Sequence, residues 1–353
     1  MSDLNINNIT DRTGDSGPVI AGVSTVSSTG AFTVPVGPTE YRGGRGRGLF
    51  AGGYTPSSPS ITNVIDMIEI ATTGNATDFG DIALSGNAGS SSNSIRGVFN
   101  YCNVPSSINT MNYTVISSSG GVADFGDLSY VTRDGPYGAG DNTRGVLGGS
   151  AGGPSNMGGS PGQGVNFIDY ITFATTGDSS EFGDLIIKRR GMGACSSPTR
   201  TVFGGGYIKP QSHTKVIDVV TTQTKGDSIK FGELTVSRGH MGACSSTTRG
   251  IWYGGSIYPG SDVFYNTIDY ITIASNGNAT DFGDTVSGGG IHFMNGTASN
   301  QTRGVWAGGA TPTYQDQMDY VTIATTGNGT DFGNLTTTAV KKAGASDNHG
   351  GLG

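Results

Sequence analysis

The chain has 353 residues, of which 62 are Gly and 13 are Pro, together about 21%, below the ~25–30% of aperiodic low-complexity sequence. Charged residues account for 13% and the net charge is −7, which excludes charge-driven disorder and disfavours a dedicated polyanion binder. The glycines do not recur at every third position, which excludes collagen, and inside helices each would cost about 1 kcal/mol. We therefore expect an all-β protein with many short strands and turns.

Residues 1–46 precede the regular part of the chain. The stretch VSTVSSTGAFTV, from Val23 to Val34, predicts a short hairpin around Thr29–Gly30. A segment of this length cannot bury a core of its own, so we expect residues 1–46 to form an assembly arm and linker that docks on another surface. Met1 is not followed by an apolar leader, and no run approaches the ~18–20 apolar residues of a membrane span.

Six repeats follow, each marked by an Arg before a short apolar strand, as in RGLFAGG and RGVWAGG. The arginines that begin these strands recur at a nearly constant interval and are Arg47, Arg96, Arg144, Arg200, Arg249 and Arg303. Each repeat has a second block, IDYITIASNGNATDFGD in the fifth, and two repeats carry GACSS before the Arg. Four short β segments per unit of about 51 residues, repeated six times, predict a six-bladed β-propeller over residues 47–353.

The ends of the repeat region predict how the ring closes. No GACSS strand precedes Arg47, and the last repeat continues into KKAGASDNHGG, from Lys341 to Gly351. This C-terminal segment should therefore become the innermost strand of the first blade. Closure of that kind removes the open sheet edge that invites aggregation.

The repeat pattern over residues 47–353 resembles kelch repeats. It has an Arg before the inner strand, at Arg189 and Arg238, then a second strand that ends in Gly-Gly, and then two outer strands. The sequence motif TTGNATDFGD, together with GACSS, is similar to kelch-like repeats in virion proteins of tailed marine bacteriophages, of the cyanophage kind. The stretch NITDRTGDSGPVIAGVSTVSSTGAFTVPVG is similar to the opening of fibre and decoration proteins of such phages. The resemblance implies a virion structural protein, assembled in the host cytoplasm and present as a homo-oligomer or in many copies.

The recurring residues are expected to hold the blades together. The six repeat arginines should act as structural staples that bind backbone carbonyls or an Asp, and the Phe of each Phe-Gly step should pack between blades. Acids paired at a constant spacing within the repeat, such as Asp269 and Asp284, leave two interpretations open, turn capping and Ca²⁺ binding. No other cofactor or metal is expected.

No catalytic site is predicted. Asp-Phe-Gly occurs four times, but the Gly-rich loop, strand Lys and His-Arg-Asp loop of a kinase are missing. The four histidines are spread between His213 and His349 without metal-ligand spacing. Cys195 and Cys244 occupy equivalent positions on inner strands, which predicts buried packing roles.

Length variation falls in two kinds of loop that leave the propeller on the same face. One lies between the repeat Arg and the next Asp and is longest in the third repeat, and the other lies between the last acid and the next Arg. Insertions on one face of a repeat protein mark its binding face, and rigid rings suit sugar or protein surfaces. Alternatively, these rings cover the blade ends. The candidate binding residues are Tyr54, Tyr137, Tyr207, Tyr258, Phe264, Tyr265, His292 and Tyr314.

The function expected is that of a phage tail fibre, adhesin or capsid decoration protein. It would dock on other virion proteins through residues 1–46 and present the propeller to a host-surface glycan or protein, without binding nucleic acid or inserting into a membrane. Two alternatives come from other classes: a cellular kelch-type scaffold for protein–protein contacts, and a propeller carbohydrate-active enzyme.

Overall fold

The computed structural model describes residues 19–20, 23–24, 46–56, 60–83, 87–102, 108–118, 120–132, 135–152, 164–210, 212–257, 263–286, 296–311 and 313–352. The chain divides into two compact units, Met1–Arg45 and Gly46–Gly353. In the first unit, β1 (Val19–Ile20) pairs antiparallel with β2 (Val23–Ser24). Val23–Ser24 thus pairs with residues that precede it in the chain. The hairpin expected around Thr29–Gly30 lies outside the described residues.

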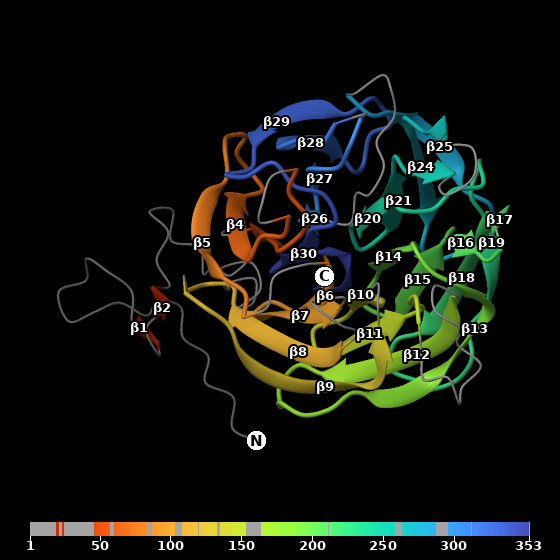
Figure 1. Ribbon diagram of the computed structural model, residues 1–353, viewed down its shortest axis with the longest axis horizontal. Coiled ribbons are helices and arrows are strands. Elements are labelled where there is room, and N and C mark those ends of the chain that lie inside the picture. Colours follow the sequence, from red (N-terminus) through yellow and green to blue (C-terminus); the bar gives the residue numbers. More distant parts are fainter. Residues whose placement is uncertain are drawn as a thin grey trace, which may run out of the picture. The chain divides into compact units, whose positions relative to one another are not determined.

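In the second unit the described residues form six four-stranded antiparallel sheets around a ring (Figure 1). The predicted all-β, six-bladed propeller is therefore confirmed. The structure contains no helix that could cross a membrane within the residues it describes.

Blades I to III cover the first half of the ring, with strands named here from the channel outwards. Blade I contains β30 (Ala343–Ser346), β3 (Arg47–Ala51), β4 (Val64–Glu69) and β5 (Thr77–Asp81). Blade II contains β6 (Asn87–Ser92), β7 (Arg96–Cys102), β8 (Ile108–Val115) and β9 (Ala123–Thr132). Blade III contains β10 (Tyr137–Gly140), β11 (Arg144–Gly148), β12 (Val165–Thr172) and β13 (Ser180–Arg189).

Blades IV to VI follow the same plan. Blade IV contains β14 (Gly193–Ser196), β15 (Arg200–Gly204), β18 (Val216–Thr221) and β19 (Ile229–Glu233). Blade V contains β20 (Gly242–Ser245), β21 (Arg249–Tyr253), β24 (Thr267–Thr272) and β25 (Thr280–Asp284). Blade VI contains β26 (Gly296–Ser299), β27 (Arg303–Ala307), β28 (Gln317–Thr322) and β29 (Thr330–Asn334). Two-residue ladders, β16 (Tyr207–Ile208) with β17 (Ser212–His213) and β22 (Ser256–Ile257) with β23 (Val263–Phe264), lie in loops of blades IV and V.

Antiparallel order places the loops on two opposite faces of the ring. We call the face with the second-to-third-strand loops and the inter-blade connections the variable face. The face with the first-to-second-strand and third-to-fourth-strand turns is the regular face. The repeat arginines start the second strand and therefore lie at the regular face.

The C-terminal strand closes the ring as predicted. β30 pairs with β3 in blade I, with Gly48 opposite Ser346 and Ala51 opposite Ala343. The main-chain N–H of Arg47 donates to Asp347 Oδ1 at 2.9 Å, so the contact joins the two ends of the propeller sequence. A one-turn 3-10 helix, η2 (Gly350–Leu352), follows and is buried.

Each repeat Arg directs its guanidinium to the next blade. Its Nη1 donates to a main-chain oxygen just beyond the third strand of that blade, at 2.6–3.4 Å. The pairs are Arg47–Ile116, Arg96–Phe173, Arg144–Thr222, Arg200–Ile273, Arg249–Ile323 and Arg303–Ile70. Because the last pair joins blade VI to blade I, these contacts run around the whole ring.

The outer strand of a blade approaches the third-to-fourth-strand turn of the next blade so closely that the Phe-Gly step admits no side chain at its second residue. Gly283 has φ +150°, and a Cβ there would collide with the backbone of Gly327 in the next blade. The Gly327 N–H donates to Phe282 O at 2.8 Å, and Phe282 is 3% exposed. A residue with a side chain at Gly283 would separate the two blades.

We expect deletion of residues 341–353 to unfold most of the protein. The loss of β30 opens the ring and exposes the core of blade I, a change comparable to the ~5–15 kcal/mol that stabilises a whole domain. Thermal unfolding followed by circular dichroism measures this. Deletion of residues 1–40 is the control and should leave the transition in place, whereas an unchanged melt of the C-terminal truncation would contradict the closure.

Candidate functional site

The predicted binding residues on the variable face occupy different environments. Tyr54, Tyr137, Phe264, Tyr265 and Tyr314 are half-buried. Tyr258 and His292 lie outside the described residues. These five residues are thus partly covered and still present part of their surface to solvent.

Tyr207 differs from this pattern, and of the two interpretations it fits the one in which the ring covers a blade end. It is 4% exposed, its hydroxyl donates to Pro210 O at 3.0 Å, and the Arg190 guanidinium lies 4.9 Å from its ring centroid. Tyr207 also exchanges two backbone hydrogen bonds with Arg190. The loop folds back onto the entry to the inner strand, which buries the ring.

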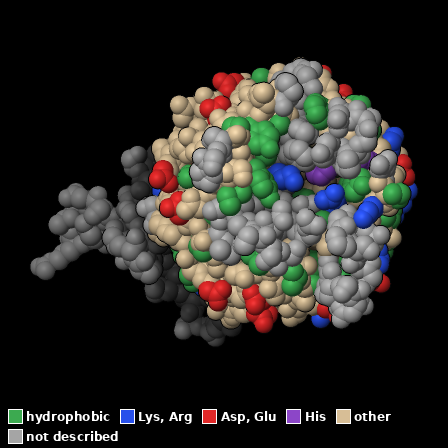
Figure 2. All heavy atoms as spheres, in the orientation of Figure 1, with side chains coloured by type: hydrophobic (Ala, Val, Ile, Leu, Met, Phe, Trp, Pro, Cys, Tyr) green, Lys and Arg blue, Asp and Glu red, His purple; other side chains and the backbone are tan. Residues whose placement is uncertain are grey.

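Basic side chains gather inside the rim of the variable face, whereas Asp and Glu lie around its edge (Figure 2). The described loops of this face contribute exposed Lys209 and Lys215 and half-buried Arg190 and Lys341. Lys341 Nζ lies 5.8 Å from the ring centroid of Tyr54. Cations beside aromatic rings are thus a recurring arrangement on this face.

Three further cations are buried below this face, each paired with the Asp of a third strand. Arg189 lies 3.1 Å from Asp218, Arg238 lies 2.9 Å from Asp269, and Lys342 lies 3.0 Å from Asp66, all with fully buried side chains. Burial lowers the pKa of all three cations and raises that of Asp218, while the attraction within each pair opposes these shifts. These pairs fix the entry to the inner strand and are not open to a ligand.

The two acids of each repeat do not share one environment. Asp269 is buried and accepts from Arg238 and from Thr235 of the preceding blade, whereas Asp284 is exposed at the end of β25. Within the described ranges, no group of three or more His, Cys, Asp or Glu side chains is arranged to hold a metal ion. The first acid of the pair joins neighbouring blades.

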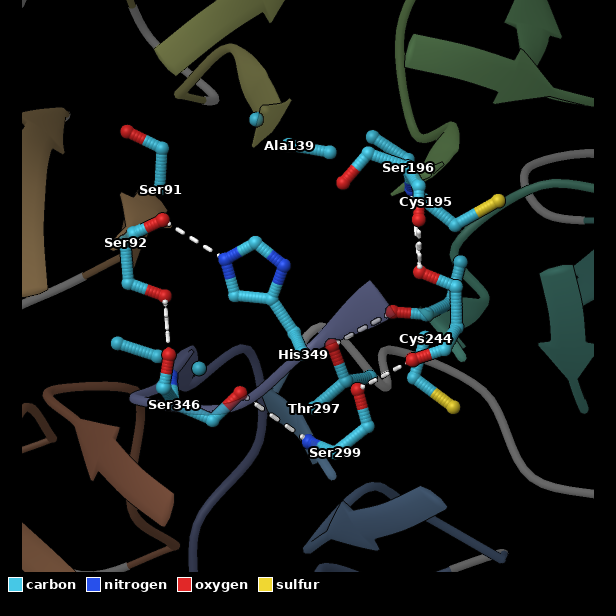
Figure 3. A pocket seen from close by; sticks show the side chains of 16 residues that line it. Ser91, Ser92, Ala139, Cys195, Ser196, Cys244, Thr297, Ser299, Ser346 and His349 are labelled. Atoms are coloured by element: carbon cyan, nitrogen blue, oxygen red, sulfur yellow. Dashed lines mark hydrogen bonds between the residues drawn. The ribbon is translucent and has the colours of Figure 1, made fainter. Parts of the chain in front are cut away.

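A cavity of about 50 Å³ occupies the central channel between the inner strands (Figure 3). Its wall consists of small residues, among them Ser196, Ser245, Ser299 and Ser346, together with His349. A water takes ~30 Å³ in the liquid, and pockets for drug-sized ligands start near ~300 Å³. The described channel therefore has room for water and not for a sugar.

Serine hydroxyls join the inner strands at the regular end of this channel. Four of these hydroxyls donate to the main-chain oxygen of the preceding blade. The pairs are Ser196–Gly140, Ser245–Ser196, Ser299–Ser245 and Ser92–Ser346, at 2.7–3.0 Å. Blade III breaks the pattern because Gly140 stands at the serine position and has no hydroxyl to offer Ser92.

His349 supplies the missing donor. Its Nε2 lies 2.8 Å from Ser92 O, and the Gly351 N–H donates to its Nδ1 at 3.1 Å. A carbonyl oxygen only accepts, so the proton of the neutral ring is on Nε2. Burial lowers the pKa of His349. The histidine thus holds η2 across the channel end.

Both described channel cysteines are inert as nucleophiles at neutral pH. Burial raises the pKa of Cys195 and Cys244, so both remain thiols. Their sulfurs pack toward the next blade: a Cβ at Gly250 would lie 2.5 Å from Cys195 Sγ. The buried packing role predicted for Cys195 and Cys244 agrees with this geometry.

The comparisons with known proteins add no relative: no protein-family model matches the sequence, and no curated protein matches it.

Sequence reasoning missed the roles of Lys342 and His349. Lys342 stands where blades IV and V have Met192 and Met241, so the repeat alignment does not predict an ion pair there. The signal for His349 was the Gly at position 140 in a column of serines. That signal has meaning only once the chain end is known to cross the channel.

We expect Lys342→Met to destabilise the protein by about 3–5 kcal/mol, because it leaves the buried Asp66 carboxylate without its cation. Denaturant unfolding monitored by tryptophan fluorescence measures the change. The double variant Lys342→Met/Asp66→Asn should recover most of the loss, since Met and Asn occupy these positions in other blades. Equal stability of the single and double variants would contradict a paired role.

We expect the wild-type chain to lose stability relative to His349→Gln as the pH falls from 7.5 to 5. A lowered folded-state pKa means that stability is present above the unfolded-state pKa of ~6.5 and is lost as the pH falls toward the folded-state value. Gln keeps one donor and one acceptor but does not titrate. Nearby Asp347, whose pKa burial raises to about 6, and Asp141 are present in both proteins. Parallel melting temperatures across this range would refute the assignment.

Proposed function

We propose that this protein is a non-enzymatic structural and binding component of a tailed-phage virion. It docks through residues 1–46 and presents the variable face of the propeller to the host surface. The proposal is supported by the likeness of its repeats and of its N-terminal stretch to kelch-like virion proteins. The cellular scaffold remains the second candidate, since a propeller with one variable face suits protein partners as well.

One observation carries the proposal: the ring interior is occupied by contacts between blades, while the variable face combines half-buried rings with cations. Half-buried Tyr54 beside Lys341 is an example, and half-buried Arg190 adds a second cation over the buried ring of Tyr207. The faces of aromatic rings favour the apolar C–H faces of sugar rings, and Lys and Arg favour carboxylate or phosphate groups. The ligand class that fits best is an anionic glycan of the host envelope.

The arm is tested by deleting residues 1–40. We expect a soluble propeller with the wild-type melting temperature that is absent from purified particles, because nothing then attaches it. Immunoblotting of gradient-purified particles measures incorporation. Incorporation at the wild-type level would show that docking does not depend on the arm.

The binding face is tested with Arg190→Gln/Lys341→Gln. We expect binding of fluorescent propeller to host cells to fall at least about tenfold, because each lost contact to a charged group is worth ~1.5–3 kcal/mol. Lys230→Gln, on outer strand β19, is the control and should bind like the wild type. Unchanged binding of the double variant would contradict recognition at the variable face.

A further inference from the structure

The repeat arginines do more than bind backbone oxygens, because in four blades the guanidinium also covers a Tyr ring of the third strand. The distances from Cζ to the ring centroid are 4.6 Å for Arg96–Tyr113, 4.4 Å for Arg144–Tyr170, 4.7 Å for Arg249–Tyr270 and 4.7 Å for Arg303–Tyr320. Each Tyr in turn meets the Phe of the outer strand edge to face, with centroids 5.8–6.2 Å apart. An Arg–Tyr–Phe stack thus closes the side of these four blades.

Blade IV lacks the middle ring of this stack. Val219 stands at the Tyr position, while Arg200 keeps its blade-to-blade contacts, donating to Ile273 O at 3.1 Å and to Asn276 Oδ1 at 3.0 Å. A hollow of about 300 Å³ lies at this place, with Arg200, Val219, Thr221, Lys225, Ile229 and Asn276 among its lining residues. The guanidinium is held in the same manner as in the other blades but has no ring beneath it.

Blade I shows what else the position accepts. Met67 replaces the Tyr there, and Glu69, which corresponds to Thr221, accepts from Arg47 Nε at 3.2 Å. An apolar group with a neighbouring carboxylate therefore satisfies the same arginine. At the six equivalent positions, all of which the structure describes, Val219 is the shortest side chain.

The walls of the hollow suit an aromatic residue with acidic neighbours. Ile229 is 63% exposed and offers an apolar wall. Lys225 adds a second cation, with its Nζ 5.3 Å from the ring of Tyr170 in blade III, while Asp227 is the one acid in the lining. The excess of positive charge favours an anionic partner segment.

We propose that this hollow is a docking slot for an aromatic side chain of a partner protein, flanked by acidic residues. The incoming ring stacks on Arg200 in the place that Tyr fills in four other blades, and a neighbouring carboxylate binds as Glu69 does in blade I. The slot lies at the side of the ring toward the regular face, away from the proposed glycan-binding loops. It therefore gives the propeller a second contact, to a protein neighbour, and its test is independent of the proposed function.

The test uses the full chain with ¹³C-labelled isoleucine methyl groups, so that Ile229 reports on the slot. The probes are p-cresol, for the ring alone, and the peptide acetyl-Glu-Tyr-Glu-amide, with acetyl-Glu-Leu-Glu-amide as the comparison. We expect p-cresol and the Tyr peptide to shift the Ile229 resonance with Kd of about 1–10 mM, within the range that so small a contact supports. The Leu peptide should bind at least several-fold more weakly because it has no π face.

Two variants separate the slot from general surface binding. Val219→Tyr supplies the missing ring from within, so it should abolish both shifts and raise the melting temperature by about 1–3 °C. Tyr270→Val opens the equivalent place in blade V and should create a second p-cresol site. The proposal is overturned if wild type and Val219→Tyr bind alike, if p-cresol binds but the Tyr peptide does not, or if Tyr270→Val gains no site.

Discussion

The whole structure depends on how closely neighbouring blades approach one another. At the inner end, a Cβ at Gly48 would lie 2.6 Å from Ala298 Cβ of blade VI, and one at Gly250 would meet the sulfur of Cys195. At the outer end, Gly283 lies against the backbone of the next blade. Packing at this density leaves no room for a side chain, so glycine is required at the contact and the adjacent residues are free to bury larger groups. The glycine-rich composition is a direct consequence of this constraint.

Where the repeat departs from its common residue, another group usually compensates. Blade IV has Thr201 in place of the contact Gly, and its hydroxyl lies 3.0 Å from the hydroxyl of Thr222 in the same blade. Gly140 leaves a hydroxyl missing from the serine ring, and His349 replaces it from the chain end. Val219 is different, because no side chain of the described residues replaces the Tyr ring. That uncompensated position is where we place the docking slot.

The fold was largely predictable because its signals repeat. Because the Arg strand and the block from Asp to Phe-Gly each occur six times, an uncertain strand assignment in one repeat is resolved by the others. The C-terminal segment resembles the GACSS strand that the first repeat lacks, which identifies it as the closing strand. The candidate site was less predictable. Tyr207 lies in a loop where the sequence leads one to expect exposed rings, yet this loop pairs with Arg190 and the Tyr207 ring is buried. The burial depends on backbone hydrogen bonds between two segments that the repeat pattern does not relate. Lys342 forms the same kind of ion pair as Arg189 from a later position in the repeat, so alignment alone conceals it.

The amino-acid sequence was enough to predict the number of blades, their strand order and the closure, since these depend on local periodicity and on one unpaired segment. It also placed the six arginines at equivalent points. The folded ring was needed to show which aromatic rings stay accessible, how the terminal histidine completes the serine ring, and where the Arg–Tyr–Phe stack is incomplete. Those properties arise between residues far apart in the sequence, where burial and hydrogen-bond partners are set by the curvature of the closed ring.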